Sequence, residues 1–370
     1  MKVLSSKYVA GVVIIAILIC VGQVIWLSLE RQAYQKDIAV YQTIIQSFLP
    51  KTTDVDALMD IHSPQDIQTK RHELINKIWG QSSLPSTIPY SIEKDILDTR
   101  YQSIKEIKTI HRLTVRMDYG LNSIVYIFMP HHPTSTIVMY HQGHEGDFIS
   151  GQKIIQRLLM EGYAVAGFSM PLLGMNNQPI VYLNRFGKFR LTDHDHFKML
   201  LPEKGHPVQY FLTPVIEVIN TAEVLGFTNI AMLGISGGGW TSTLIAALDP
   251  RILRSYPVAG TLPIYLRSDN PTNWGDYEQT IPEIYRIANY LELYIMGAFG
   301  FNRKQMQILN AHDPCCFNGT TYQTYYQPLK TRVQHLQKGT FEIFSDNTNL
   351  THSISPLAID LIVNDLHTAF

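Results

Sequence analysis

The sequence predicts an α/β fold, in which a mostly parallel central sheet is flanked by helices, carries cap insertions, and is preceded by an apolar N-terminal helix. Short apolar runs, such as the β-branched STIVMY (135–140) and NIAMLG (229–234), indicate buried strands. Segments with helical periodicity separate these runs, and strands that alternate with helices build a parallel sheet covered on both faces. Residues 8–29 contain no charged side chain, which predicts the N-terminal helix.

Length and composition exclude several classes of protein. The chain has 370 residues and 45% hydrophobic content, enough for one large globular domain with an appendage. Its 30 basic and 31 acidic residues show no bias toward an anionic partner, so nucleic acid is not expected to bind. The three cysteines, Cys20, Cys315 and Cys316, form neither a disulfide framework nor a spaced set of metal ligands. We expect the adjacent pair to be packing residues, because a disulfide between neighbours closes a strained ring.

The apolar run at residues 8–29 predicts a single-pass membrane anchor, which we assign to residues 1–29. As a helix, this run would span roughly 33 Å at about 1.5 Å per residue, enough for a bilayer core. A cleaved signal peptide is the main alternative, but no A-x-A-like cleavage site follows the run. Lys2 and Lys7 precede it, which favours a cytoplasmic N-terminus and places residues 30–370 outside the cytoplasm.

A helical stalk and connector are predicted over residues 30–103. Apolar side chains recur at helical spacing from Tyr34 to Phe48, followed by a second helical segment that ends at Gly80 and a Ser/Pro-rich connector at 81–91. The first helix would either form a short coiled coil that joins two chains into a homodimer, or pack on the globular domain.

The third domain, residues 104–370, contains the predicted sheet. The segments 111–120 and 122–130 indicate a β-hairpin, and the STIVMY strand follows. After it come a helix, a strand, a second helix and the NIAMLG strand; their ranges are 150–161, 163–170, 214–226 and 229–234. Two long segments, 172–212 and 264–304, exceed ordinary connections, and we expect them to form a cap.

The stretch GISGGG, residues 234–239, joins a predicted strand to a predicted helix. Gly234, Ser236 and Gly238 match G-x-S-x-G, the nucleophile elbow, in which small neighbours let a serine adopt a strained backbone conformation with an exposed hydroxyl. A phosphate-binding loop does not fit, because no Lys-Ser or Lys-Thr pair follows the glycines. Short glycine-serine turns are common, so the motif needs partners elsewhere in the chain.

Candidate partners for the serine follow two later strands. Asp313 ends a predicted strand, and His352 lies in a loop after another. The order Ser236, Asp313, His352 is that of nucleophile, acid and base in an α/β-hydrolase. Asp346, six residues before His352, is the rival acid, and Asp313 is favoured because it follows the strand that usually bears this residue.

Residues 104–370 thus resemble the α/β-hydrolase superfamily, in particular its esterase and peptidase branches with an extended G-x-S-x-G-G elbow, carbohydrate acetyl esterases among them. The resemblance implies a Ser-His-Asp mechanism without a cofactor or a metal ion. It also implies an oxyanion hole formed by backbone N–H groups of Gln142, Gly143, His144 and Gly237, because HQGHEGD (141–147) follows the STIVMY strand. The alternative is a polar glycine turn with solvated histidines.

Two further groups of residues were weighed as binding sites. Asp193 to His196, DHDH, contains ligand-type side chains, but a solvated cap loop is the favoured interpretation. The segment 264–304 is rich in aromatic residues, most of which we expect in a cap core, with one or two left to line a pocket or stack on a sugar.

The sequence therefore predicts a membrane-anchored serine hydrolase that cleaves a carboxylic ester, with a small-molecule or carbohydrate ester as substrate. A short-acyl ester of a surface carbohydrate fits the resemblance and the anchor. A serine peptidase with the same triad is the alternative within enzymes. A non-catalytic, membrane-anchored scaffold with an inherited fold is the alternative outside them.

Overall fold

The computed structural model describes residues 20–32, 35–36, 53–268 and 271–370. The chain divides into two compact units, Met1–Thr53 and Asp54–Phe370. In the first unit, residues 20–32 are helical, whereas residues 8–19 of the predicted anchor and most of the predicted stalk helix lie outside the described residues. Within the described part of the chain, no helix has the length and apolar character needed to cross a membrane.

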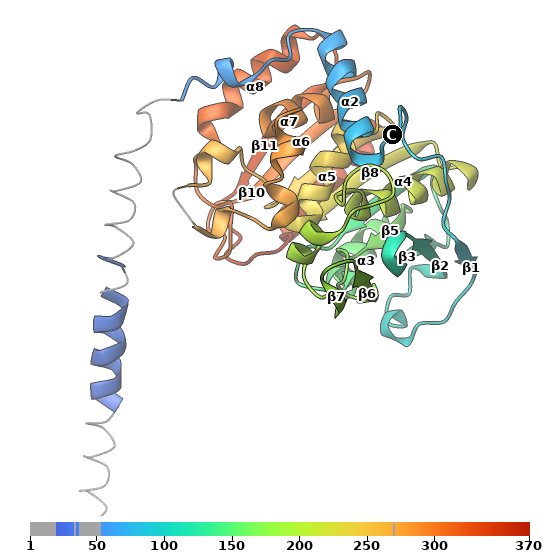
Figure 1. Ribbon diagram of the computed structural model, residues 1–370, viewed down its shortest axis with the longest axis horizontal. Coiled ribbons are helices and arrows are strands. Elements are labelled where there is room, and N and C mark those ends of the chain that lie inside the picture. Colours follow the sequence, from blue (N-terminus) through green and yellow to red (C-terminus); the bar gives the residue numbers. More distant parts are fainter. Residues whose placement is uncertain (1–19, 33–34, 37–52, 269–270) are drawn as a thin grey trace, which may run out of the picture. The chain divides into compact units, whose positions relative to one another are not determined.

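The second unit is built on a nine-stranded sheet with the order β1-β2-β3-β5-β4-β8-β9-β10-β11. Figure 1 labels β10 and β11 on one side of this unit and β1 on the other. The strands from β5 to β11 in this order pair in parallel, and β1, β2 and β3 add an antiparallel edge. The mostly parallel central sheet and the hairpin at its edge are as predicted. The strands are β1 (Ser91–Glu93), β2 (Ile107–Arg116), β3 (Asn122–Pro130), β4 (Thr136–His141), β5 (Ala164–Phe168), β8 (Asn229–Ile235), β9 (Ile252–Val258), β10 (Lys304–Asn310) and β11 (Thr340–Asp346).

Helices cover both faces of this sheet. One face carries α3 and α9, and the other carries α2, α4, α5, α7 and α8. The helices are α2 (Pro64–Trp79), α3 (Gln152–Met160), α4 (Gln209–Val224), α5 (Gly237–Leu248), α6 (Pro282–Tyr285), α7 (Tyr290–Ala298), α8 (Gln323–His335) and α9 (Pro356–Ala369).

Strand β8 shows why the sheet needs helices on both faces. Ile230 and Met232 face one hydrophobic core, while Ala231 and Leu233 face the other, and all four are buried. Successive side chains of a strand point to opposite faces, so a run of apolar residues without polar interruptions needs cover on both sides. The polar residues that follow such strands are left at the carboxyl edge of the sheet.

Residues 54–103, assigned from the sequence to a stalk and connector, belong to the same compact unit as the sheet. Helix α2 buries Leu74 and Ile78 in the core, and Arg71 donates a hydrogen bond to the carbonyl oxygen of Ala247 in α5. Strand β1 pairs with β2. The globular unit therefore begins at Asp54, because the apolar face of α2 packs on the domain.

The two predicted cap insertions differ in structure. Residues 172–212 contain a small hairpin, β6 (Ile180–Leu183) with β7 (Gly187–Arg190), and a 3₁₀ turn at His194–Met199. Much of 264–304 is core instead, because α7 packs against α5 and buries Tyr290 and Tyr294 completely. Trp274 of this segment is exposed and lines a cavity.

Candidate active site

Ser236 lies at the sharp turn between β8 and α5. Its backbone has φ 57° and ψ −123°, a conformation that side chains rarely adopt. The flanking glycines make the turn possible, because a Cβ on Gly234 would lie 2.0 Å from the carbonyl oxygen of Gly238. A Cβ on Gly238 would lie equally close to the carbonyl oxygen of His141 at the end of β4. The strand, turn and helix of a nucleophile elbow are therefore present.

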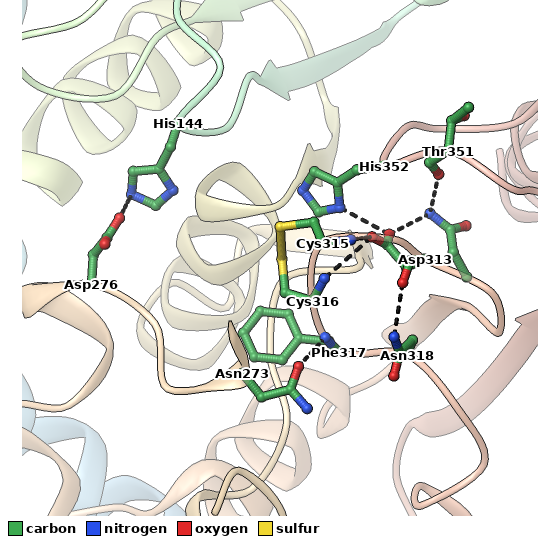
Figure 2. The surroundings of a disulfide bond; sticks show 11 residues. His144, Asn273, Asp276, Asp313, Cys315, Cys316, Phe317, Asn318, Thr351 and His352 are labelled. Atoms are coloured by element: carbon green, nitrogen blue, oxygen red, sulfur yellow. Dashed lines mark hydrogen bonds and ion pairs between the residues drawn. A yellow bond between two sulfur atoms is a disulfide. The ribbon is translucent and has the colours of Figure 1, made fainter. Parts of the chain in front are cut away.

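Asp313 and His352 are in direct contact beyond the ends of β10 and β11. His352 Nδ1 lies 2.8 Å from Oδ2 of Asp313, and Figure 2 shows the imidazole directed toward that carboxylate. Because a carboxylate oxygen accepts, Nδ1 carries the proton and Nε2 keeps its lone pair. This Nε2 atom is buried and has no hydrogen-bond partner among the described residues. In the neutral ring, the contact with Asp313 therefore places the proton on Nδ1 and leaves Nε2 as an acceptor.

The Asp313 carboxylate is buried and well supplied with donors. Its Oδ1 accepts from the backbone amides of Cys315 and Cys316 at 2.9 and 3.3 Å, and its Oδ2 also accepts from Nδ2 of Asn310 at 3.1 Å. Burial raises the pKa of Asp313, but the hydrogen bonds from His352 and the Cys315 amide outweigh it and leave the pKa below the usual value. The acid therefore stays ionised at neutral pH.

Cys315 and Cys316 form a disulfide beside this pair (Figure 2). We expected two packing residues without a bond between them, so that prediction was wrong. The bonded pair lies in the turn whose amides hold Asp313, and its sulfur atoms lie within 4.8 Å of a ring nitrogen of His352.

Asp346, the rival acid, has a different set of partners. Its Oδ1 accepts from the amides of Thr348 and Asn349, and its Oδ2 accepts from the hydroxyl of Ser355. The side chain is fully buried and organises the loop that leads from β11 to α9. The carboxylate that contacts His352 is that of Asp313.

The loop after β4 lies against the elbow. A Cβ on Gly143 would be 2.5 Å from the Cβ of Ser236, so this backbone passes directly beside the serine. Gly237 is the first residue of α5, and its N–H has no acceptor within the helix. Gln142 was predicted to donate its N–H to an oxyanion. In the structure this N–H donates to the carbonyl oxygen of Phe168 at 2.9 Å and is therefore not available for an oxyanion.

The two histidines of HQGHEGD make specific contacts in the structure, which corrects the alternative interpretation of a turn with solvated histidines. His141 is buried, and its Nδ1 lies 2.7 Å from the carbonyl oxygen of Gln142. Burial lowers the pKa of His141 to about 4, so the ring is neutral at physiological pH. The ring of His144 packs beside Gly237, where a Cβ would lie 2.5 Å from its Cε1 atom.

His144 faces two carboxylates that sequence reasoning did not select. Its Nε2 lies 2.8 Å from Asp276 and 3.0 Å from Glu278 (Figure 2 shows the first contact). Burial disfavours a charge on His144, but hydrogen bonds to both carboxylates outweigh it and raise the pKa to about 10. His194 lies beside Glu278 and is buried, so the DHDH segment is not a solvated loop at this residue. The sequence shows histidine and carboxylate side chains in each of these segments. It does not indicate that the loop after β4 and the two insertions meet in the fold.

Two cavities flank these residues. One, of about 520 Å³, is lined by His352 together with Gln142 and Ile235, the residue before Ser236. The other, of about 490 Å³, is lined by His144 and Trp274 among others. Space for a ligand therefore exists beside His352 and beside the loop after β4.

A serine on a strained strand-to-helix turn, with a buried Asp–His pair beyond later strands, defines the class of α/β-hydrolase-like proteins. The fold is similar to that of acetyl xylan esterase 1 from a Thermoanaerobacterium species, with a TM-score of 0.51, 13% identity, and coverage of 85% of this chain and 98% of that chain. A methylesterase is similar with a TM-score of 0.52 and 11% identity, over 89% of this chain and 67% of that chain. No protein-family model and no curated protein matches the sequence. The chain has the α/β-hydrolase fold.

Proposed function

We propose that the chain is a serine hydrolase that cleaves a carboxylic ester through an acyl-enzyme. The observation that carries the proposal is the Asp313–His352 hydrogen bond, which leaves the buried Nε2 atom of His352 as an unpartnered acceptor. Ser236 supplies the hydroxyl, on an elbow at the same carboxyl edge of the sheet. Among the described residues His352 Nε2 has no hydrogen-bond partner, Ser236 included, so proton transfer requires the serine hydroxyl to turn or move toward it.

The reaction follows from these groups. Ser236 Oγ bonds to the ester carbonyl carbon while its proton moves to His352 Nε2. The amides of Gly143, His144 and Gly237 stabilise the oxyanion, and Gln142 takes no part because its N–H is already bonded. His352 then protonates the departing alcohol, and the ester C–O bond breaks. Water attacks the acyl-enzyme in the same way, which releases the acid and restores Ser236.

The substrate that we favour is a short-acyl ester, with an acetyl group on a carbohydrate as the leading candidate. The likeness to an acetyl xylan esterase supports it. Trp274, exposed in the loop that lines the 490 Å³ cavity, offers a ring on which a sugar can stack. We further propose that residues 8–29 anchor the chain in a membrane and place the second unit outside the cytoplasm, because this run is uncharged and two lysines precede it.

The test uses the full-length chain in detergent and a fluorophosphonate probe that bonds to activated serines. We expect one site labelled per chain, no labelling of Ser236→Ala, and full labelling of Ser242→Ala, a serine in α5 whose hydroxyl donates to the carbonyl oxygen of Gly238 within the helix. Turnover of Ser236→Ala should fall by roughly four to six orders of magnitude. Undiminished labelling of Ser236→Ala would refute the assignment of Ser236 as the nucleophile. An unlabelled wild-type chain would indicate a non-catalytic scaffold.

An acyl-length series then tests the substrate. A capped pocket discriminates by about 1 to 3 kcal/mol per misplaced methylene, so activity should decrease steeply from acetyl to octanoyl esters. An increase along the series would indicate a lipid-directed esterase. Cleavage of aminoacyl amides without cleavage of acetyl esters would indicate a peptidase.

A further inference from the structure

Four potential metal ligands from three separate segments meet in the second unit. His144 comes from the loop after β4, His194 from the first insertion, and Asp276 and Glu278 from the second insertion. His144 and Glu278 are 134 positions apart in the chain. One ligand atom of each residue lies within 4.8 Å of every other. We call these four residues the His/carboxylate cluster.

Three separations within the cluster are close to those of tetrahedral coordination, and the remaining ligand atoms lie within 4.8 Å of one another. His144 Nε2 lies 2.8 Å from Asp276 Oδ2 and 3.0 Å from Glu278 Oε1, and His194 Nδ1 lies 3.4 Å from Glu278 Oε2. A tetrahedral zinc ion with bonds of about 2.0 Å holds its ligand atoms roughly 3.3 Å apart. Small adjustments would therefore let one ion contact all four side chains.

The orientation of His194 gives a second, independent sign of a ligand. Its Nε2 lies 2.9 Å from the carbonyl oxygen of Pro171, which can only accept, so Nε2 is the donor. A neutral ring with this hydrogen bond directs the Nδ1 lone pair toward Glu278. Metal-binding histidines are typically held in this way, with the far nitrogen donating to a carbonyl or carboxylate oxygen.

Glu278 is fully buried, but one of its two carboxylate oxygens lacks a hydrogen bond. Its Oε2 atom faces His194 Nδ1 at 3.4 Å, an ion pair only when that ring is protonated, and makes no hydrogen bond to any other described residue. A buried carboxylate oxygen without a partner is costly, and a cation between it and the imidazole nitrogen would remove that cost. A divalent ion also balances the two negative charges of Asp276 and Glu278.

The surroundings suit a transition metal. Two nitrogen and two oxygen donors are a ligand set that zinc accepts, whereas calcium and magnesium prefer oxygen ligands only. The rings of Phe197 and Phe211 pack against His194 and supply an apolar shell. His144, His194 and Asp276 also line the 490 Å³ cavity, which offers an entry path.

We propose that the His/carboxylate cluster binds a divalent transition-metal ion, best matched by zinc. The ion ties both insertions to the loop after β4, whose backbone lies against Ser236. Its role is to fix the position of this loop and of the cavity wall. Binding does not depend on the proposed hydrolase activity.

The test measures metal directly on the full-length chain, purified without a polyhistidine tag. The protein is stripped with a chelator, equilibrated with zinc, separated from free metal by gel filtration, and analysed by mass spectrometry of the elements. We expect one zinc per chain in the wild type and loss of that zinc in Glu278→Gln and in His194→Ala. Cobalt should bind to the same stripped protein with the intense visible absorption of a tetrahedral site.

Two neighbours outside the cluster serve as matched controls. His196→Ala removes a histidine that accepts from the Thr192 amide, and Asp195→Asn changes a solvent-exposed carboxylate beside His194. Both variants should retain one zinc. Zinc should raise the unfolding temperature of the wild type and of both controls, but not that of Glu278→Gln.

The outcomes separate the alternatives without reference to activity. Far less than one zinc per wild-type chain, with an unfolding temperature that zinc leaves unchanged, would refute the proposal and leave an ion-pair network of imidazolium and carboxylate groups. Retention of zinc by folded Glu278→Gln and His194→Ala would also refute it, because the ion would then bind elsewhere.

Discussion

Replacement of Asp313 by asparagine tests the proposed mechanism at its most specific point. In the structure, Oδ2 of Asp313 accepts from His352 Nδ1 and Oδ1 accepts from the Cys315 amide. Asparagine keeps one of these acceptors and turns the other into a donor. With its NH₂ group toward the ring, it donates to Nδ1, so the imidazole proton moves to Nε2. The ring can then no longer accept a proton from Ser236.

The size of the effect follows from loss of the base. A wrong histidine tautomer in a serine triad costs about 10⁴ in kcat, which corresponds to about 5 kcal/mol at about 1.36 kcal/mol per decade. The opposite amide orientation would place NH₂ against the Cys315 N–H and leave buried donors unpaired, at about 1–3 kcal/mol of stability. We therefore expect a folded Asp313→Asn protein with about 10⁴-fold slower fluorophosphonate labelling and ester hydrolysis, measured beside its thermal unfolding.

Asp346→Asn is the matched control, because its carboxylate is equally buried and also follows a strand but contacts Thr348, Asn349 and Ser355. It should lose less than about tenfold in rate, since the imidazole tautomer is unaffected. If folded Asp313→Asn keeps more than a tenth of the wild-type rate, or if Asp346→Asn is the more damaged variant, the assignment of the acid is wrong.

Three further predictions concern the loop, the fold and the membrane. Gly143→Ala would place a Cβ 2.5 Å from that of Ser236 and 2.7 Å from the carbonyl oxygen of Ile235, so kcat/KM should fall by roughly a hundredfold and the unfolding temperature should decrease; full activity would contradict the proposed oxyanion loop. His141 has a pKa of about 4 in the folded protein against about 6.5 unfolded, so its contribution to stability is complete above pH 6.5 and decreases as the pH falls toward 4. In urea unfolding, the stability lost between about pH 6.5 and about pH 4 should be about 3 kcal/mol smaller in His141→Asn than in the wild type; equal losses would contradict the burial argument. Protease added outside sealed right-side-out vesicles should digest residues 30–370, and protection would reverse the proposed orientation.

The strands and the elbow could be predicted because their causes are local. A buried strand is a short apolar run, and β4, β5 and β8 lie where such runs occur. A serine with positive φ needs small neighbours within the same few residues, so Gly234 and Gly238 marked the turn before any fold was known. The order of Ser236, Asp313 and His352 is likewise a property of the chain alone.

The start of the globular unit could not be predicted in this way. The sequence of α2 shows a helix, but an amphipathic helix looks the same whether it packs on a partner or on its own domain. Contacts from Arg71 to α5 and from Trp79 to α4 decided that it packs on its own domain. Tyr290 and Tyr294 belong to the core for the same reason, since α7 packs on α5.

By itself, the sequence determined the α/β fold, the elbow at Ser236 and two candidate acids, because each depends on neighbours along the chain. Only the tertiary structure decided that Asp313 contacts His352, because both acids follow strands. The Asp346 carboxylate is instead hydrogen-bonded to the loop that follows β11. The tertiary structure also decided that the Gln142 amide donates to the neighbouring strand and that His144 contacts the carboxylate of Glu278, 134 positions away. Contacts of this range depend on how loops close over the sheet, and residue spacing does not encode that closure.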